Sequence, residues 1–157
     1  MVFILLNFTP TFSGLVDGYF WEVFAWGGSR ARVGGMRYEF ELPYPPSLNT
    51  YYRHVGAKVL ISERGRAYGS EVERLVRALR SRGSLGPEAL EGRLGLRVAM
   101  NPPDNRKRDI DNILKSTLDA LTHAGLWCDD SQVDRLTIER GACVRGGRLS
   151  VCVATID

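Results

Sequence analysis

The chain has 157 residues, of which 44% are hydrophobic and 25% are charged, and its formal net charge is +3. This length suits one domain with a single hydrophobic core, and the composition is that of an ordinary soluble globular protein. A net charge this small does not identify a nucleic-acid-binding protein.

The three cysteines, Cys128, Cys143 and Cys152, are an odd number without close spacing, which argues against a disulfide framework and against a zinc site. Free thiols, with Cys143 and Cys152 buried in strands, fit a reducing cytoplasm.

Residues 1–35 differ from the rest of the chain. Met1 to Phe12 is apolar, but it lacks a basic segment and is too short to span a bilayer, so no membrane association is expected. A regular strand pattern starts only at Met36. We therefore expect a domain over 36–157, preceded by an extension or a misassigned start at 1–35. A genuine pair of N-terminal strands, or an arm that binds a partner, is the alternative.

The first half of the expected domain contains signals for strands and one helix. Apolar and charged residues alternate over 37–42, which predicts a half-buried strand. The proline-rich segment 43–47 ends this strand and favours an extended loop, and 58–61 predicts a short strand. Ser62 can then cap a helix whose apolar residues recur at helical spacing up to Leu79.

The second half repeats this arrangement and adds two strands. Alternation over 94–100 predicts a second long strand. A helix is expected over about 109–124, with Gly125 as the residue that follows its end. Residues 133–144 and 149–156 predict two further strands, and the Arg-Gly-Gly-Arg between them is a hairpin turn signal.

The resulting order is strand, helix, strand, helix, strand, strand. It predicts an α/β (α+β) domain, with a single mixed β-sheet and two main helices packed on it. The last two strands are expected to form an antiparallel hairpin at the C-terminal end. No internal repeat or low-complexity tract interrupts the order.

Charged residues gather around the start of the second helix. Asp109 and Asp111 are two residues apart, so their carboxylates converge only if Asp109 is the N-cap and Asp111 lies in the first turn. Lys115 follows Asp111 by four residues and is expected beside it. Helix-dipole stabilisation and a simple acid–base pair explain such a pattern on their own. They do not explain two further groups: the basic run Arg106, Lys107 and Arg108 before the helix, and the acidic pair Asp129 and Asp130 after it.

Together these residues predict a metal site beside a nucleic-acid backbone. A cluster of Asp109, Asp111 and Asp130 offers only oxygen ligands, which select Mg²⁺ or Mn²⁺ over zinc. Such an ion lowers the pKa of bound water and neutralises charge on a scissile phosphate. Lys115 can stabilise the pentacoordinate phosphorus or help to activate the water, and the basic run can bind phosphate oxygens. Asp129 is expected to be an N-cap or turn residue.

The segment Tyr51-Tyr52-Arg53-His54 places aromatic rings beside a cation. Such a group can stack on an unpaired base or grip the DNA backbone, with Tyr52 and Arg53 as the candidate contacts. The alternative is that one tyrosine packs on the sheet while the other is exposed. His123 lies near the end of the predicted helix, where its charge complements the helix dipole, so we expect a structural role for it.

Part of the chain resembles the core of the RusA-type Holliday junction resolvases (crossover junction endodeoxyribonucleases): RKRDIDNILKSTLDALTHAGLWCDDSQV. Two more segments, LPYPPSLNTYYRH and GGRLSVCV, resemble the family's sequence before and after this core. The resemblance implies a small α/β homodimer that nicks four-way DNA junctions symmetrically with Mg²⁺, for which Mn²⁺ can substitute. It assigns catalytic and metal-binding carboxylates to Asp109, Asp111 and Asp130, and an essential lysine to Lys115. Asn112 also matches the family's pattern, and we expect it and Asp129 to support the ligands.

Three functions are therefore open. A Mg²⁺-dependent endonuclease that resolves branched DNA in recombination and repair is the leading hypothesis. A branched-DNA-binding protein without catalysis is the alternative from another class, although all four candidate catalytic residues are present. A metal nuclease that acts on flaps or duplex DNA is the third.

Overall fold

The computed structural model describes residues 36–156, which belong to one compact unit. The expectations for residues 1–35 lie outside this range. Within it, none of the helices is long and apolar enough to cross a membrane. The elements are, in chain order, β1 (Arg37–Pro43), α1 (Leu48–Tyr51), β2 (Tyr52–Val55), β3 (Lys58–Ile61), α2 (Glu63–Ser81), β4 (Arg93–Asn101), the 3₁₀ turn η2 (Asp111–Ile113), α3 (Leu114–His123), the 3₁₀ turn η3 (Asp130–Gln132), β5 (Val133–Arg140) and β6 (Arg148–Ile156).

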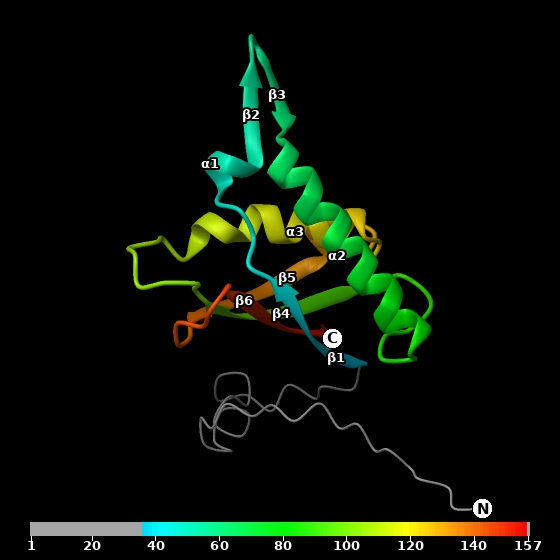
Figure 1. Cartoon of the computed structure of the whole chain (residues 1–157). Helices are drawn as coiled ribbons and strands as arrows, with labels where there is room; N and C mark the ends of the chain where they lie inside the picture. Colours follow the sequence, from blue (N-terminus) through cyan, green and yellow to red (C-terminus); the bar gives the residue numbers. More distant parts are fainter. Residues whose placement is uncertain (1–35, 157) are drawn as a thin grey trace, which may run out of the picture. The chain divides into compact units, whose positions relative to one another are not determined.

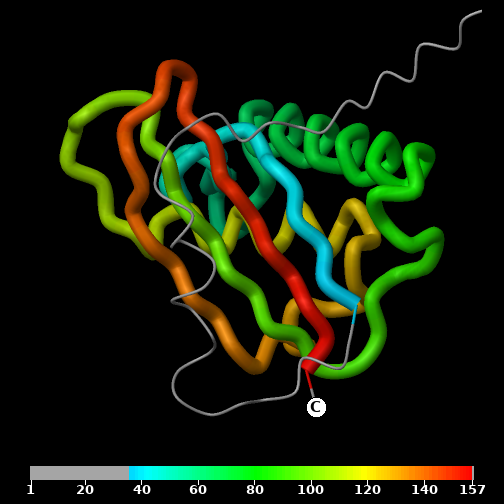
Figure 2. The backbone as a smooth tube through the Cα atoms, turned by 90° about the horizontal axis from the view of Figure 1, so that it is seen from below, coloured from blue at the N-terminus to red at the C-terminus, as the bar shows by residue number. Residues whose placement is uncertain are grey.

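Four of the strands form one mixed sheet in the order β1-β6-β4-β5. β6 is antiparallel to both of its neighbours, β1 and β4, whereas β4 and β5 are parallel. The helices α2 and α3 lie on one face of this sheet (Figures 1 and 2). The predicted α/β class, with a mixed sheet and two main helices, is confirmed. The prediction of a single sheet is wrong, because β2 and β3 form a second, two-stranded sheet.

The core lies between the sheet and the two helices. Alternate residues of the two central strands are buried, as the period of two in a strand requires: Leu94, Leu96, Val98 and Met100 of β4, and Leu149, Val151 and Val153 of β6. Trp127 is only 1% exposed, and its indole N–H donates to Thr122 Oγ1 at 2.7 Å. This packing fixes the chain where it leaves α3, and the acidic pair follows after one further residue, Cys128.

The expected C-terminal hairpin is wrong. β4 lies between β5 and β6, so the last two strands are not neighbours. β5 ends at Arg140, four residues earlier than expected, and Gly141 then donates to the Met100 carbonyl at 2.8 Å. Gly146 and Gly147 do turn the chain, with φ of +83° and +67°. The turn leads into β6 in the middle of the sheet, where β6 is paired along both edges and buries its apolar side.

The cysteines are all free, as predicted. Cys152 is half-buried in β6, but Cys128 and Cys143 are exposed. The predicted burial of Cys143 is therefore wrong, because β5 ends before this residue.

A hairpin does occur, but earlier in the chain. β2 pairs with β3 in antiparallel register around Gly56, whose φ is +60°. Figure 1 shows this hairpin protruding beyond the layers of sheet and helices. The strand over 58–61 is thus confirmed. Its partner β2 was not predicted, because most of its residues are exposed and no alternation of apolar residues marks it.

Two of the predicted caps are present, at the start of α2 and at the end of α3. Ser62 Oγ accepts a hydrogen bond from the Gly65 N–H at 3.0 Å at the start of α2. Gly125 follows α3 with φ of +71°, and the Leu126 N–H bonds to the Leu121 carbonyl at 3.0 Å. This six-residue closure is a Schellman motif, which glycine favours because it lacks a Cβ.

Gly65→Ala is expected to lower the free energy of unfolding by about 1–3 kcal/mol, the usual cost of overpacking. A Cβ at this position would lie 2.6 Å from the Tyr51 carbonyl oxygen and 2.7 Å from Ile61 Cγ2. Gly69 is the matched control, since it lies one turn later in α2 and a Cβ there would meet nothing within 4 Å. Gly69→Ala should raise the free energy of unfolding by about 0.5–1 kcal/mol. Urea denaturation measures both; equal effects would contradict the close packing of α1 on α2.

Candidate active site

Lys115 lies in the first turn of α3 between two carboxylates. Its ammonium nitrogen is 2.7 Å from Asp119 Oδ1 and 3.8 Å from Asp130 Oδ2. These ion pairs replace the predicted pairing with Asp111, because residues 111–113 form a 3₁₀ turn and the four-residue spacing aligns side chains only along an α-helix. The hydrogen bond to Asp119 raises the pKa of Lys115. A lysine that stays protonated favours stabilisation of phosphate charge over proton abstraction from water.

Asp119 joins Lys115 to the hairpin. Its carboxylate also accepts a hydrogen bond from the Tyr52 hydroxyl, and only 17% of its side chain is exposed. Burial, followed by this hydrogen bond, raises the pKa of Tyr52. Asp119 was not among the predicted site residues, although its position four residues after Lys115 in a helix was an available signal.

A capped turn holds Asp130 in place. Asp129 is the N-cap of η3, as predicted, and its carboxylate accepts from the Ser131 N–H at 2.9 Å. Gln132 completes the capping box by accepting from the Asp129 N–H at 3.0 Å. The Gln132 amide also donates to two carbonyls in the loop before β4. The backbone of Asp130 is therefore fixed from both sides.

Asp109 and Asp111 lie exposed where helical backbone begins. The prediction that Asp109 is the N-cap is wrong, because η2 starts the helical region and its N-cap is Ile110. The Asn112 amide nitrogen is 3.5 Å from Asp109 Oδ2, which is a long hydrogen bond. Asn112, which was expected to orient a ligand, thus contacts one of the candidate ligands.

The basic run before η2 is partly engaged within the protein. Arg108 makes two hydrogen bonds to the Asp104 carboxylate, at 2.6 and 2.8 Å, and its carbonyl accepts from Arg140 at 2.5 Å. The hydrogen bond from Arg108 lowers the pKa of Asp104 to about 2, so this pair remains charged at neutral pH. The side chain of Arg106 is 84% exposed, and Lys107 is also exposed. These two residues are accessible to a phosphate backbone.

The hairpin segment follows the expected alternative only in part, because one tyrosine is buried but the other is not exposed. Tyr51 is buried, at 2% exposure, whereas Tyr52 is half-buried and Arg53 and His54 are exposed. The two tyrosine rings pack edge to face with centroids 4.8 Å apart. Arg53 and His54 therefore lie on an accessible strand next to a fixed aromatic ring.

The family model for Endodeoxyribonuclease RusA matches residues 43–154, which include every candidate site residue. The chain belongs to the RusA family. This confirms the resemblance found in the sequence. Crossover junction endodeoxyribonuclease rusA of Enterobacteria phage HK97 is 42% identical over 120 residues, which cover 76% of this chain and 96% of that protein.

Two other RusA relatives agree with this assignment. Crossover junction endodeoxyribonuclease rusA of Enterobacteria phage 82 is 39% identical over 116 residues, covering 74% of this chain and 92% of that protein. The protein of the same name from Escherichia coli strain K12 is 38% identical over 117 residues, with the same coverage of 74% and 92%.

The oxygen donors of this RusA chain are of the type that a hard cation prefers. The predicted ligands Asp109, Asp111 and Asp130 are all carboxylates, and none is buried. Within residues 36–156, however, no three Asp, Glu, His or Cys side chains are close enough to form a metal site as they stand. Asp130 lies by Lys115, whereas Asp109 and Asp111 lie at the start of the helical region. The three-carboxylate centre and the roles of these residues remain predictions.

Proposed function

We propose that this RusA family member is a Mg²⁺-dependent endodeoxyribonuclease that resolves four-way DNA junctions by paired nicks, in recombination and repair. The observation that carries the proposal is the position of Lys115, whose side-chain nitrogen lies 3.8 Å from Asp130 Oδ2. A cation beside a partly exposed carboxylate suits charge stabilisation on a phosphate. The names of the curated relatives, crossover junction endodeoxyribonucleases, support the substrate.

In this proposal Asp109, Asp111 and Asp130 hold the Mg²⁺, for which Mn²⁺ can substitute. A bound ion of this kind lowers the pKa of a coordinated water and neutralises charge on the scissile phosphate. Clustered carboxylates repel one another, so the ion also supplies the attraction that gathering these side chains requires. Asn112 orients Asp109 through its amide.

The DNA contacts proposed are mostly to phosphates. Arg106, Lys107 and Arg108 precede the acidic residues, and Arg53 lies on the hairpin with Tyr52 beside it. Phosphate contacts read the shape of a junction more than its base sequence. Affinity should therefore fall steeply as the salt concentration rises.

A homodimer completes the proposal. A junction yields two duplexes only when two strands of like polarity are cut, and a two-fold dimer presents two identical sites at a fixed separation.

A cytoplasmic location is proposed on the strength of the three free cysteines, which suit a reducing compartment.

Cleavage of synthetic DNA tests this function. A four-way junction, a flap and a linear duplex of matching sequence are incubated with the protein in Mg²⁺. We expect paired nicks in the junction, slower cutting of the other two, and none after chelation of the metal. Faster cutting of the flap or duplex would indicate a nuclease for other substrates. A junction gel shift without cutting in Mg²⁺ or Mn²⁺ would indicate a binding protein without catalysis.

A further inference from the structure

We propose that a pocket between α1, the β2–β3 hairpin and α3 binds an unpaired nucleobase of the branched DNA, next to the phosphate that is cut. This inference rests on the proposed junction-cutting function and adds a base-binding site to it. The pocket has a volume of about 500 Å³, within the range of about 300–1,000 Å³ that is usual for small-molecule sites. Its lining residues are Leu48, Asn49, Tyr52, His54, Val59 and Lys115.

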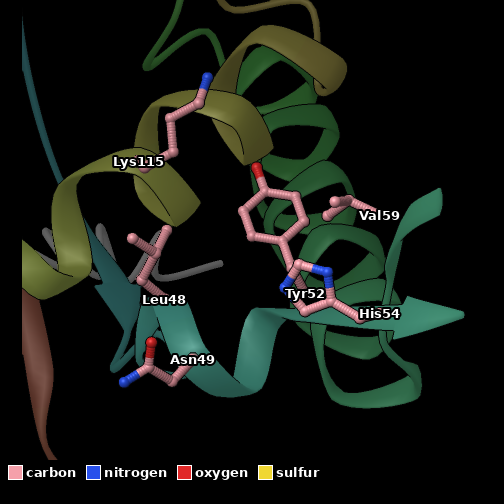
Figure 3. Close-up of a pocket in the computed structure, with 6 residues that line it drawn as sticks. All are labelled: Leu48, Asn49, Tyr52, His54, Val59 and Lys115. Atoms are coloured by element: carbon pink, nitrogen blue, oxygen red, sulfur yellow. The ribbon is translucent and has the colours of Figure 1, made fainter. Parts of the chain in front are cut away.

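The chemistry of the lining matches that of a base. In Figure 3 the Tyr52 ring lies among the other side chains, with Leu48 and Asn49 from α1 on one side and His54 and Val59 from the hairpin on the other. An aromatic ring with two aliphatic side chains offers a stacking surface. The Asn49 amide and the His54 imidazole offer donors and acceptors to the edge of a base. Leu48 and Val59 are apolar yet 37% and 56% exposed, which a binding site explains.

The aromatic ring of the pocket is fixed before any ligand arrives. The Tyr52 hydroxyl donates to Asp119, and its ring packs edge to face on Tyr51 with an interplanar angle of 75°. A preorganised ring loses little conformational entropy when a base stacks on it. The pocket is therefore suited to capture a base that is already free of its partner.

The position of the pocket specifies which base it receives. Lys115 lines the pocket, and the same ammonium group is 3.8 Å from Asp130 in the candidate active site. A base held here belongs to a nucleotide adjacent to the phosphate under attack. A base inside a duplex is stacked on both faces, so the occupant must be unpaired or extruded, and such bases cost least to present at a branch point.

Two substitutions on β3 and a set of abasic junctions test this inference. Val59→Trp fills the pocket, whereas Leu60→Trp adds the same bulk to the next residue, which is 40% exposed and does not line the pocket. Each junction of a set carries a single abasic nucleotide, at a different position beside the phosphate that is cut. On the intact junction we expect Val59→Trp to weaken binding about tenfold, the effect of one lost stacked base, and Leu60→Trp to change little.

The abasic junctions alter the DNA and leave the wild-type protein unchanged, so a folding defect of a variant cannot explain their effect. At one abasic position the affinity of the wild-type protein should fall about tenfold below its affinity for the intact junction. The affinity of Val59→Trp should be the same for that abasic junction as for the intact one. If the wild type cuts the intact junction but binds every abasic junction as tightly as the intact one, the pocket inference is overturned and the proposed function stands. If Val59→Trp instead changes the molar mass of the free protein by light scattering, the surface serves self-association and the inference is also overturned. Failure of the wild type to bind or cut any junction would remove the proposed function itself.

Discussion

Changing Asp111 to Asn is expected to slow the cutting of a four-way junction in Mg²⁺ by about a thousandfold while junction binding persists. The substitution preserves the size of the side chain but removes the charge that a hard cation requires. Charge stabilisation by a metal ion is worth several kcal/mol, and a loss of about 4 kcal/mol corresponds to about a thousandfold in rate. Asp111 is exposed, so folding should be preserved. Junction affinity should hold or rise, because one negative charge near the phosphate is gone.

Asp134→Asn is the matched control for this variant. It makes the same chemical change in a carboxylate of β5 that pairs with Arg93 at 2.5 Å, outside the candidate site. Such surface pairs contribute little to stability, so cutting should stay near the wild-type rate. Single-turnover cutting and gel shift on one junction measure both variants. Full-rate cutting by Asp111→Asn would contradict its role as a ligand, and equal slowing by both variants would indicate a general effect of charge.

The helices and strands that face the core were predictable from the sequence. Leu94 to Met100 alternates because β4 has one buried face, and the apolar stripe of α2 recurs because that helix has one buried side. The caps at Ser62 and Gly125 were also predictable, since each meets a local geometric need of a helix end. In all these cases the signal and its cause lie within a few residues of each other.

Pairing between elements was predicted less well. Nothing in 133–156 indicates that β4 lies between the last two strands, because β4 is more than 30 residues earlier in the sequence. A turn signal such as Gly146-Gly147 reports only that the chain turns there. Likewise β2 is formed by residues without a buried face, so no periodicity marks it. Long-range partners of this kind are set by the packing of the whole sheet.

In the candidate site, too, local features were predicted better than contacts between distant residues. The identities of Lys115 and Asp130 as site residues came from local pattern and family resemblance, and the structure places them 3.8 Å apart. The pairing of Lys115 with Asp111 failed because a 3₁₀ turn breaks the helical spacing. The link that Asp119 makes between Lys115 and the hairpin was not predictable, because its second partner, Tyr52, lies 67 residues away in the sequence.

Asp119→Asn is expected to slow junction cutting by about 10–100-fold, the usual cost of losing an outer partner of a metal site. Asp119 holds the Lys115 ammonium at 2.7 Å, closer than Asp130 does at 3.8 Å. Without the Asp119 charge, the ammonium pairs with Asp130 and competes with the metal ion for that carboxylate. The Mg²⁺ concentration that gives half-maximal cutting should therefore rise. The Asn side chain can still accept from Tyr52, so the hairpin should stay in place.

A double variant separates this mechanism from a purely structural role. If Asp119 acts through Lys115, then Asp119→Asn should have little further effect in a Lys115→Gln background, since the two residues form one coupled pair. Glu73→Gln is the control, because it breaks a pair of the same four-residue spacing with Arg77 on α2. This control should leave both the rate and the Mg²⁺ requirement unchanged. An undiminished loss in the Lys115→Gln background, with an unaltered Mg²⁺ requirement, would mean that Asp119 works through Tyr52 and the hairpin instead.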